Sequence, residues 1–353
     1  MKCKLTIAGI GVIATLCFQP PASHAQDVHF TQFDAQPLLL NPANTGAFNG
    51  DWRASAIYRD QWRSILGVSA FKTYAASFDM PVIRDISIDD YLAAGLQVYN
   101  DRAGDGNLSN FTALLSVAYH KFLGRDGKQV LTFGLQGGYS QKSIDLSRLY
   151  FGDEFDEGIF NRGTSSEYSS LGPRTDGFLI NAGINYAQSV SENFSFTIGA
   201  GVNNINQPLE SLDTRGKRAD VGLSMRYTGQ IGAIIQTSDR FSLRPAVLVQ
   251  SQATAMEIIA GNEFRYKLGE ESELDYPTVP TVFAGVWYRH EDAIMGTIGV
   301  QLKGFRIGFG YDYNISDLSN ATNGNGGFEV SIGYIAPNPL AFAHRLLFPC
   351  ARF

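Results

Sequence analysis

The sequence is poor in cysteine and, beyond its first residues, in long apolar runs. Its cysteines are Cys3, Cys17 and Cys350. Two early lysines, an apolar core and a small-residue cleavage site ending at Ala25 predict a signal peptide over residues 1–25. The mature chain would then keep one thiol, which excludes an internal disulfide and a multi-cysteine metal site. Because no later run of 18 or more residues is apolar, no transmembrane helix is predicted.

Basic charge and clustered catalytic groups are also scarce. The formal net charge is −6, so an exported acidic chain of this kind is a poor nucleic-acid binder. No G-x-S-x-G elbow or glycine-rich phosphate loop is present, which predicts no catalytic residue. A Ser–His–acid set built around His120 or His290 stays as a less favoured alternative. No metal or cofactor is predicted, because the mature histidines never pair at ligand spacing; they are His29, His120, His290 and His344.

What the chain has in abundance is glycine, aromatic residues and strict alternation. In residues 131–139 leucine, phenylalanine and tyrosine alternate with threonine, glycine and glutamine, and residues 305–314 repeat the pattern. A period of two predicts strands with one apolar and one polar face. Their length of about ten residues suits a tilted strand that crosses a bilayer. Tyrosine and tryptophan near strand ends, Tyr99 among them, suggest an aromatic girdle. A large soluble β-protein is the less favoured alternative.

We predict an all-β fold, a transmembrane antiparallel β-barrel of about 14 strands with a short N-terminal plug-like segment. The expected centres are residues 56, 74, 96, 115, 135, 182, 198, 223, 247, 260, 285, 298, 309 and 331. An even strand number places both termini in the periplasm and the long connections outside. These outer connections are expected at 101–107, 142–175, 204–217 and 315–327. The acidic stretch 269–278 is a long connection on the periplasmic side and breaks this asymmetry.

The expected organisation has four parts. A signal peptide (1–25) precedes a non-barrel segment (26–50), the outer-membrane barrel (51–335) and a C-terminal periplasmic tail (336–353). Charges on the polar strand faces must point inward, because a charge facing lipid costs a few kcal/mol near the midplane. They predict a lumen ion-pair network, a charged pore or a dock for the N-terminal segment. The candidate residues are Arg53, Arg59, Arg306, Asp312 and Glu329.

The stretch "VYNDRAGDGNLSN" is a candidate contact turn. Its oxygen-bearing side chains resemble a calcium loop, but arginine and alanine interrupt the series and Thr112 stands where the last ligand should be. We interpret it as a hairpin tip with two glycines at positive backbone angles and an arginine between two aspartates. The candidate residues are Asp101, Arg102, Gly104, Asp105 and Gly106. The acidic stretch 151–158 is interpreted as a solvated loop rather than a cation site.

An ordered series of motifs resembles one known family. It begins with "QDVHFTQFDAQPLLLNPANTGAF" and "YRDQWRSI" and continues through "NDRAGDG", "GLQGGYSQKSIDLSRLYFGDEFD", "NNINQP" and "YDYNIS" to the closing "PCARF". The order and spread of these motifs over the mature chain resemble the PorP/SprF family of the Bacteroidetes type IX secretion system.

The resemblance implies a non-enzymatic component of the outer membrane that acts through protein–protein contacts. Its implied partners are subunits of the secretion machinery and a secreted cargo with a C-terminal sorting domain, such as a gliding adhesin. A diffusion porin or substrate channel is the alternative function. An open lumen would favour that alternative.

Overall fold

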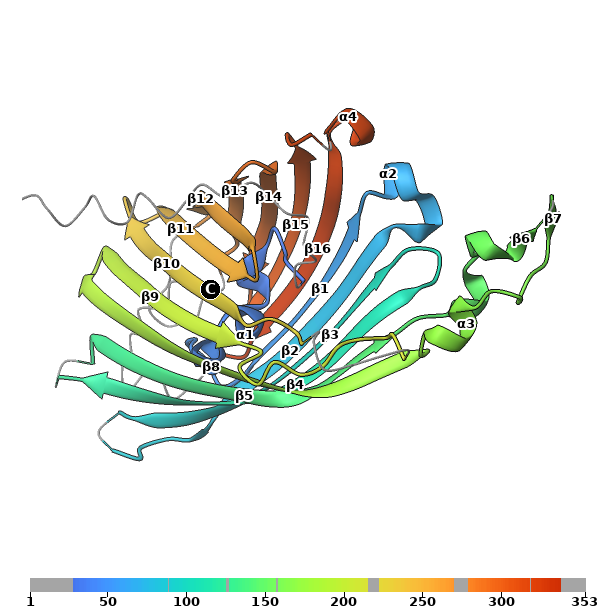
Figure 1. The fold of residues 1–353 in the computed structure, drawn as a ribbon. Coiled ribbons are helices and arrows are strands. Elements are labelled where there is room, and N and C mark those ends of the chain that lie inside the picture. Colours follow the sequence, from blue (N-terminus) through green and yellow to red (C-terminus); the bar gives the residue numbers. More distant parts are fainter. Residues whose placement is uncertain are drawn as a thin grey trace, which may run out of the picture.

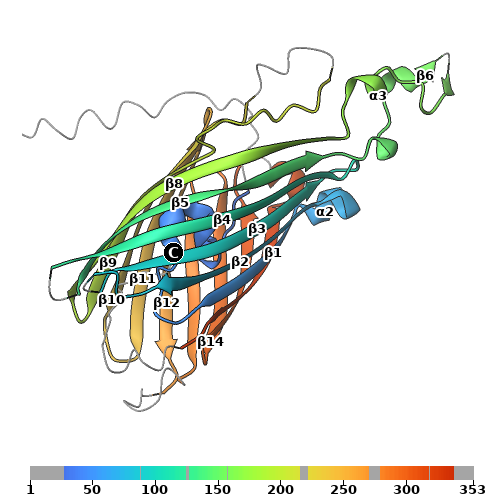
Figure 2. The same cartoon turned by 90° about the horizontal axis from the view of Figure 1, so that it is seen from below.

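The computed structural model describes residues 28–337 except 88, 125–126, 157, 215–221, 270–278 and 318. The predicted signal peptide and most of the predicted tail lie outside the described residues. Within them, fourteen long strands form one closed antiparallel barrel (Figures 1 and 2). These strands are β1 (Arg53–Gln61), β2 (Phe71–Ile83), β3 (Tyr91–Ala103), β4 (Leu108–Leu123), β5 (Gln129–Ser143), β8 (Arg174–Ser191), β9 (Phe194–Asn203), β10 (Arg226–Gln236), β11 (Phe241–Gln252), β12 (Ala255–Lys267), β13 (Thr281–Arg289), β14 (Ala293–Leu302), β15 (Phe305–Asn314) and β16 (Asn325–Ile335).

The barrel closes where its first and last long strands pair. β1 and β16 are antiparallel neighbours from Arg53 opposite Ile335 to Gln61 opposite Gly327. The fold class and the strand number predicted from alternation are thus confirmed. One predicted centre was wrong, because β10 begins three residues after position 223. The backbone before it pairs with the preceding loop instead, where the Leu223 N–H donates to the carbonyl of Pro208 over 2.9 Å.

The two faces of the wall follow the predicted alternation. In β5 the side chains of Phe133 and Leu135 are exposed on the outside, whereas Thr132 and Gln136 are buried on the inside. An apolar outer face and a polar inner face are what a membrane-spanning barrel requires. No helix in the described part of the chain is long and apolar enough to span a membrane.

Aromatic side chains decorate the outer face near the strand ends. Tyr58 and Tyr74 lie 4.9 Å apart between ring centroids on neighbouring strands, and Trp52 lies 5.0 Å from Tyr334 near the opposite end. The prediction for Tyr99 was wrong, because this side chain points inward and packs in an apolar cluster with Phe30 and other residues. Its position in β3 has the parity of the inner face.

The two ends of the barrel differ in their connections. One end has turns such as 192–193 and 303–304, whereas the other has the 30-residue connection 144–173. Long connections identify the extracellular end. The predicted acidic connection 269–278 lies almost wholly outside the described residues. The outer end also contains α2 (Arg63–Leu66), η3 (Gly67–Ser69), η4 (Leu146–Arg148), η5 (Gly152–Glu154), β6 (Phe155–Asp156), β7 (Ile159–Phe160), α3 (Glu167–Ser170) and α4 (Ser319–Thr322).

Candidate functional site

The lumen of the barrel contains the N-terminal segment. Figure 1 shows its short helix inside the barrel. Gln32 bonds to Glu329 on β16, Asp34 bonds to Arg306 on β15, and the Asp51 N–H just after the segment donates to the carbonyl of Ala336 beyond the end of β16. Most of its side chains are buried, including apolar Phe30, Phe33 and Leu38. We call residues 28–50 the plug segment. It contains η1 (Phe33–Ala35), α1 (Pro37–Leu40) and η2 (Pro42–Asn44).

Local sequence explains why the plug segment folds into short turns. Pro37 begins α1, where its missing N–H and fixed backbone angle are compatible with a first helical position. The side chain of Asn41 caps η2 by accepting a hydrogen bond from the Ala43 N–H over 2.9 Å. Gly46 has φ +74, and a Cβ atom there would lie only 2.2 Å from the Cβ of Ala93. The "NPANTG" motif therefore encodes a compact turn that fits against the wall.

Three of the predicted lumen charges meet in one buried cluster. Arg59 on β1 forms ion pairs with Asp312 on β15, at 2.7 Å, and with Glu329 on β16. The plug segment completes this cluster: the Thr31 and Gln32 N–H groups donate to the two oxygens of Glu329 over 2.7 and 2.9 Å. We call Arg59, Asp312 and Glu329 with these two plug residues the ionic wall.

Arg289 on β13 extends the ionic wall. Its guanidinium lies 3.1 Å from the carboxylate of Asp312, which thereby faces two arginines. Arg59 is only 2% exposed. Buried charges are tolerated when they are paired and hydrogen-bonded. The arrangement therefore holds the first plug residues against the barrel seam.

The other two predicted charges form separate clusters. Arg53 pairs with Asp79 on β2 over 2.7 Å and donates to the carbonyl of Asn44 over 3.0 Å. Arg306 pairs with Glu263 on β12 over 2.6 Å and with Asp34 of the plug segment over 2.9 Å. The sequence-predicted residues therefore do not form one network. Each of the three clusters nevertheless contacts the plug segment.

Uncharged amides hold the opposite side of the plug segment. The Asn41 side chain donates to the carbonyls of Ile184 on β8 and Ala200 on β9 over 3.1 and 3.2 Å. The side-chain oxygen of Asn44 accepts from Asn185 on β8 over 2.9 Å and from Gln230 on β10 over 3.0 Å. These residues form the amide wall, which consists of Asn41, Asn44, Asn185 and Gln230.

Inward-facing glycines let the plug segment approach the barrel backbone. A Cβ atom at Gly134 would lie 2.3 Å from the backbone nitrogen of Ala43, and one at Gly183 would lie 1.9 Å from the Asn41 side-chain oxygen. Such distances exclude any side chain without a shift of the plug segment. The glycine-rich inner face noted in the sequence is thus the surface on which the plug segment rests.

His120 and the amide wall are contacts that sequence reasoning missed. His120 on β4 is buried, with Nε2 2.7 Å from the carbonyl of Thr45 and Nδ1 3.0 Å from the Thr132 hydroxyl. These bonds hold the ring against the plug segment inside the barrel, not at the rim. The one available signal was the density of Asn, Pro and Gly in "NPANTG". No group of three or more potential metal ligands occurs among the described residues.

The candidate contact turn lies at the outer end, and its details differ from the expectation. β3 runs on to Ala103, and the positive backbone angles belong to Gly104 and Asn107 rather than to Gly106. Asp101 faces inward and accepts from the Thr73 hydroxyl over 2.6 Å, and Asp105 accepts from Ser69. The two aspartates are thus bonded to other groups than Arg102, which is exposed.

Gly106 instead supports the long outer connection. A Cβ atom there would lie 2.8 Å from the side chain of Leu149, and the Gly106 carbonyl accepts from the Asp145 N–H over 2.8 Å. The turn therefore buttresses the base of connection 144–173. Beyond that base the connection projects away from the barrel (Figures 1 and 2).

The acidic stretch of this connection organises its backbone. The two oxygens of Glu154 accept from the Phe151 and Gly163 N–H groups over 2.9 and 2.6 Å. The bond from the Phe151 N–H is the largest influence on the pKa of Glu154 and lowers it, while desolvation acts in the opposite direction. The carboxylate is thus a structural acceptor in the loop.

The family assignment rests on sequence. Residues 22–334 match the family described as "Type IX secretion system membrane protein PorP/SprF". The chain belongs to the PorP/SprF family. This agrees with the resemblance seen in the motifs, and the match spans the plug segment and the barrel up to Tyr334, one residue before the end of β16.

Several solved structures are similar to this PorP/SprF protein. The Ralstonia pickettii toluene transporter TbuX is 11% identical, with 85% of this chain and 92% of that chain covered and a TM-score of 0.46. A Pseudomonas aeruginosa FadL homologue is 12% identical, with 83% and 92% covered and a TM-score of 0.47. CdiB from Acinetobacter baumannii is 8% identical, with 80% and 60% covered and a TM-score of 0.39. Among curated proteins, no sequence matches this chain.

Barrel and family together give the location. This PorP/SprF protein is an integral β-barrel of the outer membrane and belongs to a membrane family of the type IX secretion system. Membership implies partners in the secretion machinery. The plug segment inside the lumen and the projecting connection are the two features of this barrel that bear on a more specific role.

Proposed function

We propose that this PorP/SprF protein is a non-enzymatic component that supports secretion or surface display of cargo with a C-terminal sorting domain. Gliding adhesins are one such cargo class. The observation that carries the proposal is that the lumen and the outer end of the barrel differ in what they present. The lumen is occupied by a segment of the chain itself, while apolar side chains are presented outside the membrane.

The apolar side chains lie at the tip of connection 144–173. Tyr150, Phe155 and Ile159 are 68%, 64% and 63% exposed. Phe155, Ile159 and Phe160 lie on the β6–β7 hairpin, and the Tyr150 ring lies 5.6 Å from that of Phe160. Exposed apolar groups that lie in water and close together mark protein-binding surfaces. We infer that this tip contacts the cargo domain. The buttress formed by Gly106 would set the direction of the tip, which gives the candidate contact turn its role.

Deletion of the gene tests the proposal at the level of the cell. We expect at least one cargo protein to disappear from the surface or the medium, as measured by comparing secreted proteomes. An unchanged secretome with intact gliding or adhesion would refute a role in secretion. The triple variant Phe155→Ser, Ile159→Ser, Phe160→Ser should reproduce the deletion, although the barrel remains heat-modifiable and membrane-inserted.

A matched variant separates contact from loop damage. Asp156→Ser changes an exposed polar residue of the same hairpin and should leave cargo display unchanged. Gly106→Leu should act like the tip variant, because the added side chain would collide with Leu149 at the base of the loop. Equal display in wild type and the triple variant would place the contact surface elsewhere.

A porin or substrate channel is the alternative function. The plug segment bonds to β1, β2, β4, β8, β10, β15 and β16 around the lumen, which favours a closed barrel. Planar-bilayer recordings decide between the two. We expect no steady conductance from the wild type. A stable open pore at rest would support the channel function.

A further inference from the structure

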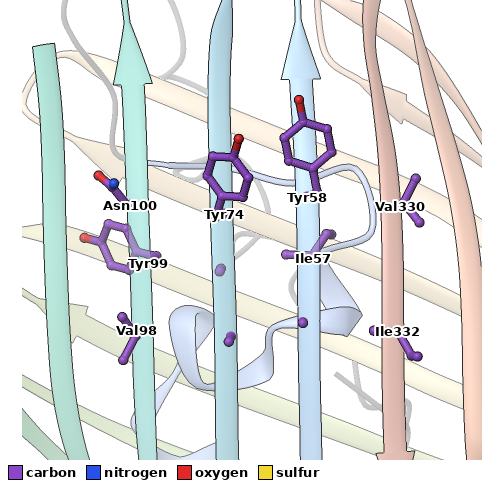
Figure 3. A pocket seen from close by; sticks show the side chains of 11 residues that line it. Ile57, Tyr58, Tyr74, Val98, Tyr99, Asn100, Val330 and Ile332 are labelled. Carbon is purple, nitrogen blue, oxygen red and sulfur yellow. The ribbon is translucent and has the colours of Figure 1, made fainter. Parts of the chain in front are cut away.

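The lipid-facing surface of the barrel has a hollow over β16, β1, β2 and β3 (Figure 3). Its volume is about 500 Å³, within the range of about 300–1,000 Å³ typical of small-molecule sites. Figure 3 shows Tyr58 and Tyr74 side by side at one end, with Val98 and Ile332 on opposite sides. The hollow faces away from the lumen, because these side chains have the parity of the outer face.

Strand register explains the hollow. Ala56 on β1 lies opposite Ala76 on β2 and opposite Ile332 on β16, and Ala76 lies opposite Val98 on β3. Two alanines thus form the floor between two branched side chains. One row nearer the outer end, Tyr58 lies opposite Tyr74, and these rings rise above the alanines. Small residues bordered by large ones leave a depression in a surface that contacts lipid.

Cations stand directly above the hollow at the outer end of the same strands. Lys72 on β2 lies opposite Arg102 on β3, and both have outward parity. Like charges directly opposite each other are unfavourable unless an anion lies between them. Asp60 on β1 lies opposite Lys72 on its other side, and Arg63 adds a third positive charge and pairs with Asp60 over 2.9 Å. Three cations and one buried carboxylate leave a net positive rim.

An apolar hollow below a cationic rim matches the chemistry of a phosphorylated lipid. The outer ends of the strands lie at the boundary between hydrocarbon and head groups. An apolar hollow below that boundary fits an acyl chain, and a cationic rim at the boundary fits a phosphate. We propose that the hollow binds one acyl chain of a phosphorylated outer-leaflet lipid of the lipid A type, with Lys72 and Arg102 holding its phosphate.

The test uses the full-length protein purified in detergent, freed of lipid and mixed with bisphosphorylated lipid A. Native mass spectrometry should count one retained lipid A per barrel. The double variant Ala56→Phe, Ala76→Phe fills the hollow and should lower the affinity at least tenfold. Gly296→Phe is the matched control, because Gly296 faces outward on β14 and a Cβ atom there meets no atom within 4 Å. That control should bind lipid A like wild type.

The rim is tested separately with dephosphorylated lipid A. Lys72→Gln and Arg102→Gln should each weaken binding of bisphosphorylated lipid A about fivefold, as expected for one cation at a membrane surface. They should not change binding of the dephosphorylated lipid. Lipid A affinity that stays unchanged in the filled variant would overturn the proposal. So would loss of a co-purifying protein from that variant with lipid binding intact, since a protein would then occupy the hollow.

Discussion

The plug segment is held by two walls of opposite chemistry. On one side Arg59, Asp312 and Glu329 bind it through ions that are almost wholly buried. On the other side its own Asn41 and Asn44 bond to the barrel through neutral amides, and inward-facing glycines bring the backbones together. The ionic wall joins the first and last strands of the barrel, whereas the amide wall crosses the middle strands.

The two walls should differ in how much stability is lost when one contact is removed. A buried ion pair gives little net stability when complete, but loss of one partner leaves an uncompensated charge. A neutral hydrogen bond contributes about 1 kcal/mol, and its loss is tolerated if the partner keeps another bond. We therefore expect the ionic wall to tolerate single substitutions poorly and the amide wall to tolerate them well. Steric changes are the exception on the amide side.

The largest effect is expected from Arg59→Met. The change leaves Asp312 and Glu329 buried with less positive charge, which should cost about 3–5 kcal/mol of unfolding free energy. Urea titration of the barrel in lipid vesicles, followed by tryptophan fluorescence, measures this loss. The triple variant Arg59→Met, Asp312→Asn, Glu329→Gln removes these three charges together. Arg289 keeps its ion pair with Asp292 at 2.5 Å, so the triple variant should recover much of the stability. A triple variant less stable than Arg59→Met would contradict this account of the ionic wall.

The next effect is expected from Gly134→Val on the amide side. The added carbon atoms would overlap the backbone at Pro42 and Ala43, and overpacking of this kind costs about 1–3 kcal/mol. Because the plug segment must shift, bilayer conductance should appear as well. Gly229→Val is the control, since a Cβ atom there meets nothing within 4 Å. Absence of bilayer conductance from the Gly134→Val barrel would show that the plug segment does not close the lumen.

Most of the fold could be predicted from the alternation of apolar and polar residues. A period of two depends only on which face of a strand meets lipid, so strands, faces and inward charges could be predicted without knowing any contact. Register could not be predicted in the same way. Arg59 lies opposite Glu329, whereas Arg53 lies opposite Ile335 several residues nearer the periplasm. This difference in height divides the expected network into separate clusters.

The contacts of the plug segment could not be predicted from the sequence for another reason. Asn41 and Asn44 lie in short irregular turns, and their partners Ile184 and Gln230 are more than a hundred residues away. No local period connects such residues. The glycines of β5 and β8 could be seen in the sequence. The sequence did not show why glycine is needed there, which is that the plug segment packs directly against these positions. The Gly106 contact was missed similarly, since a turn and a distant loop create it.

A smaller effect is expected from Asn185→Ala in the amide wall. The change removes the bond to Asn44, whose side-chain oxygen keeps its bond from Gln230 at 3.0 Å. Unfolding free energy should fall by about 1 kcal/mol, as measured by the same urea titration. A loss as large as that of Arg59→Met would erase the distinction between the two walls.

The smallest effect on the barrel is expected outside both walls, at Glu154. Its lowered pKa means that the folded loop prefers the carboxylate. The resulting loop stability is therefore present above the unfolded pKa of about 4.3 and is lost as pH falls through the lower folded pKa. Protection of the Phe151 and Gly163 amides from hydrogen exchange, relative to the intrinsic exchange rate at each pH, should fall in that acidic range. Barrel unfolding should not change, because the loop opens locally.

Glu154→Gln tests this assignment of the loop's pH response. The carboxylate accepts from both amides, one with each oxygen. A glutamine has only one acceptor oxygen, so one of the two amides would lose its hydrogen bond. Protection at Phe151 or Gly163 should then be low already at neutral pH and should not fall further in acid. If the variant kept the wild-type acid response, another group would control the loop. A simultaneous change in barrel stability would mean that the loop and the barrel unfold together, which contradicts local opening of the loop.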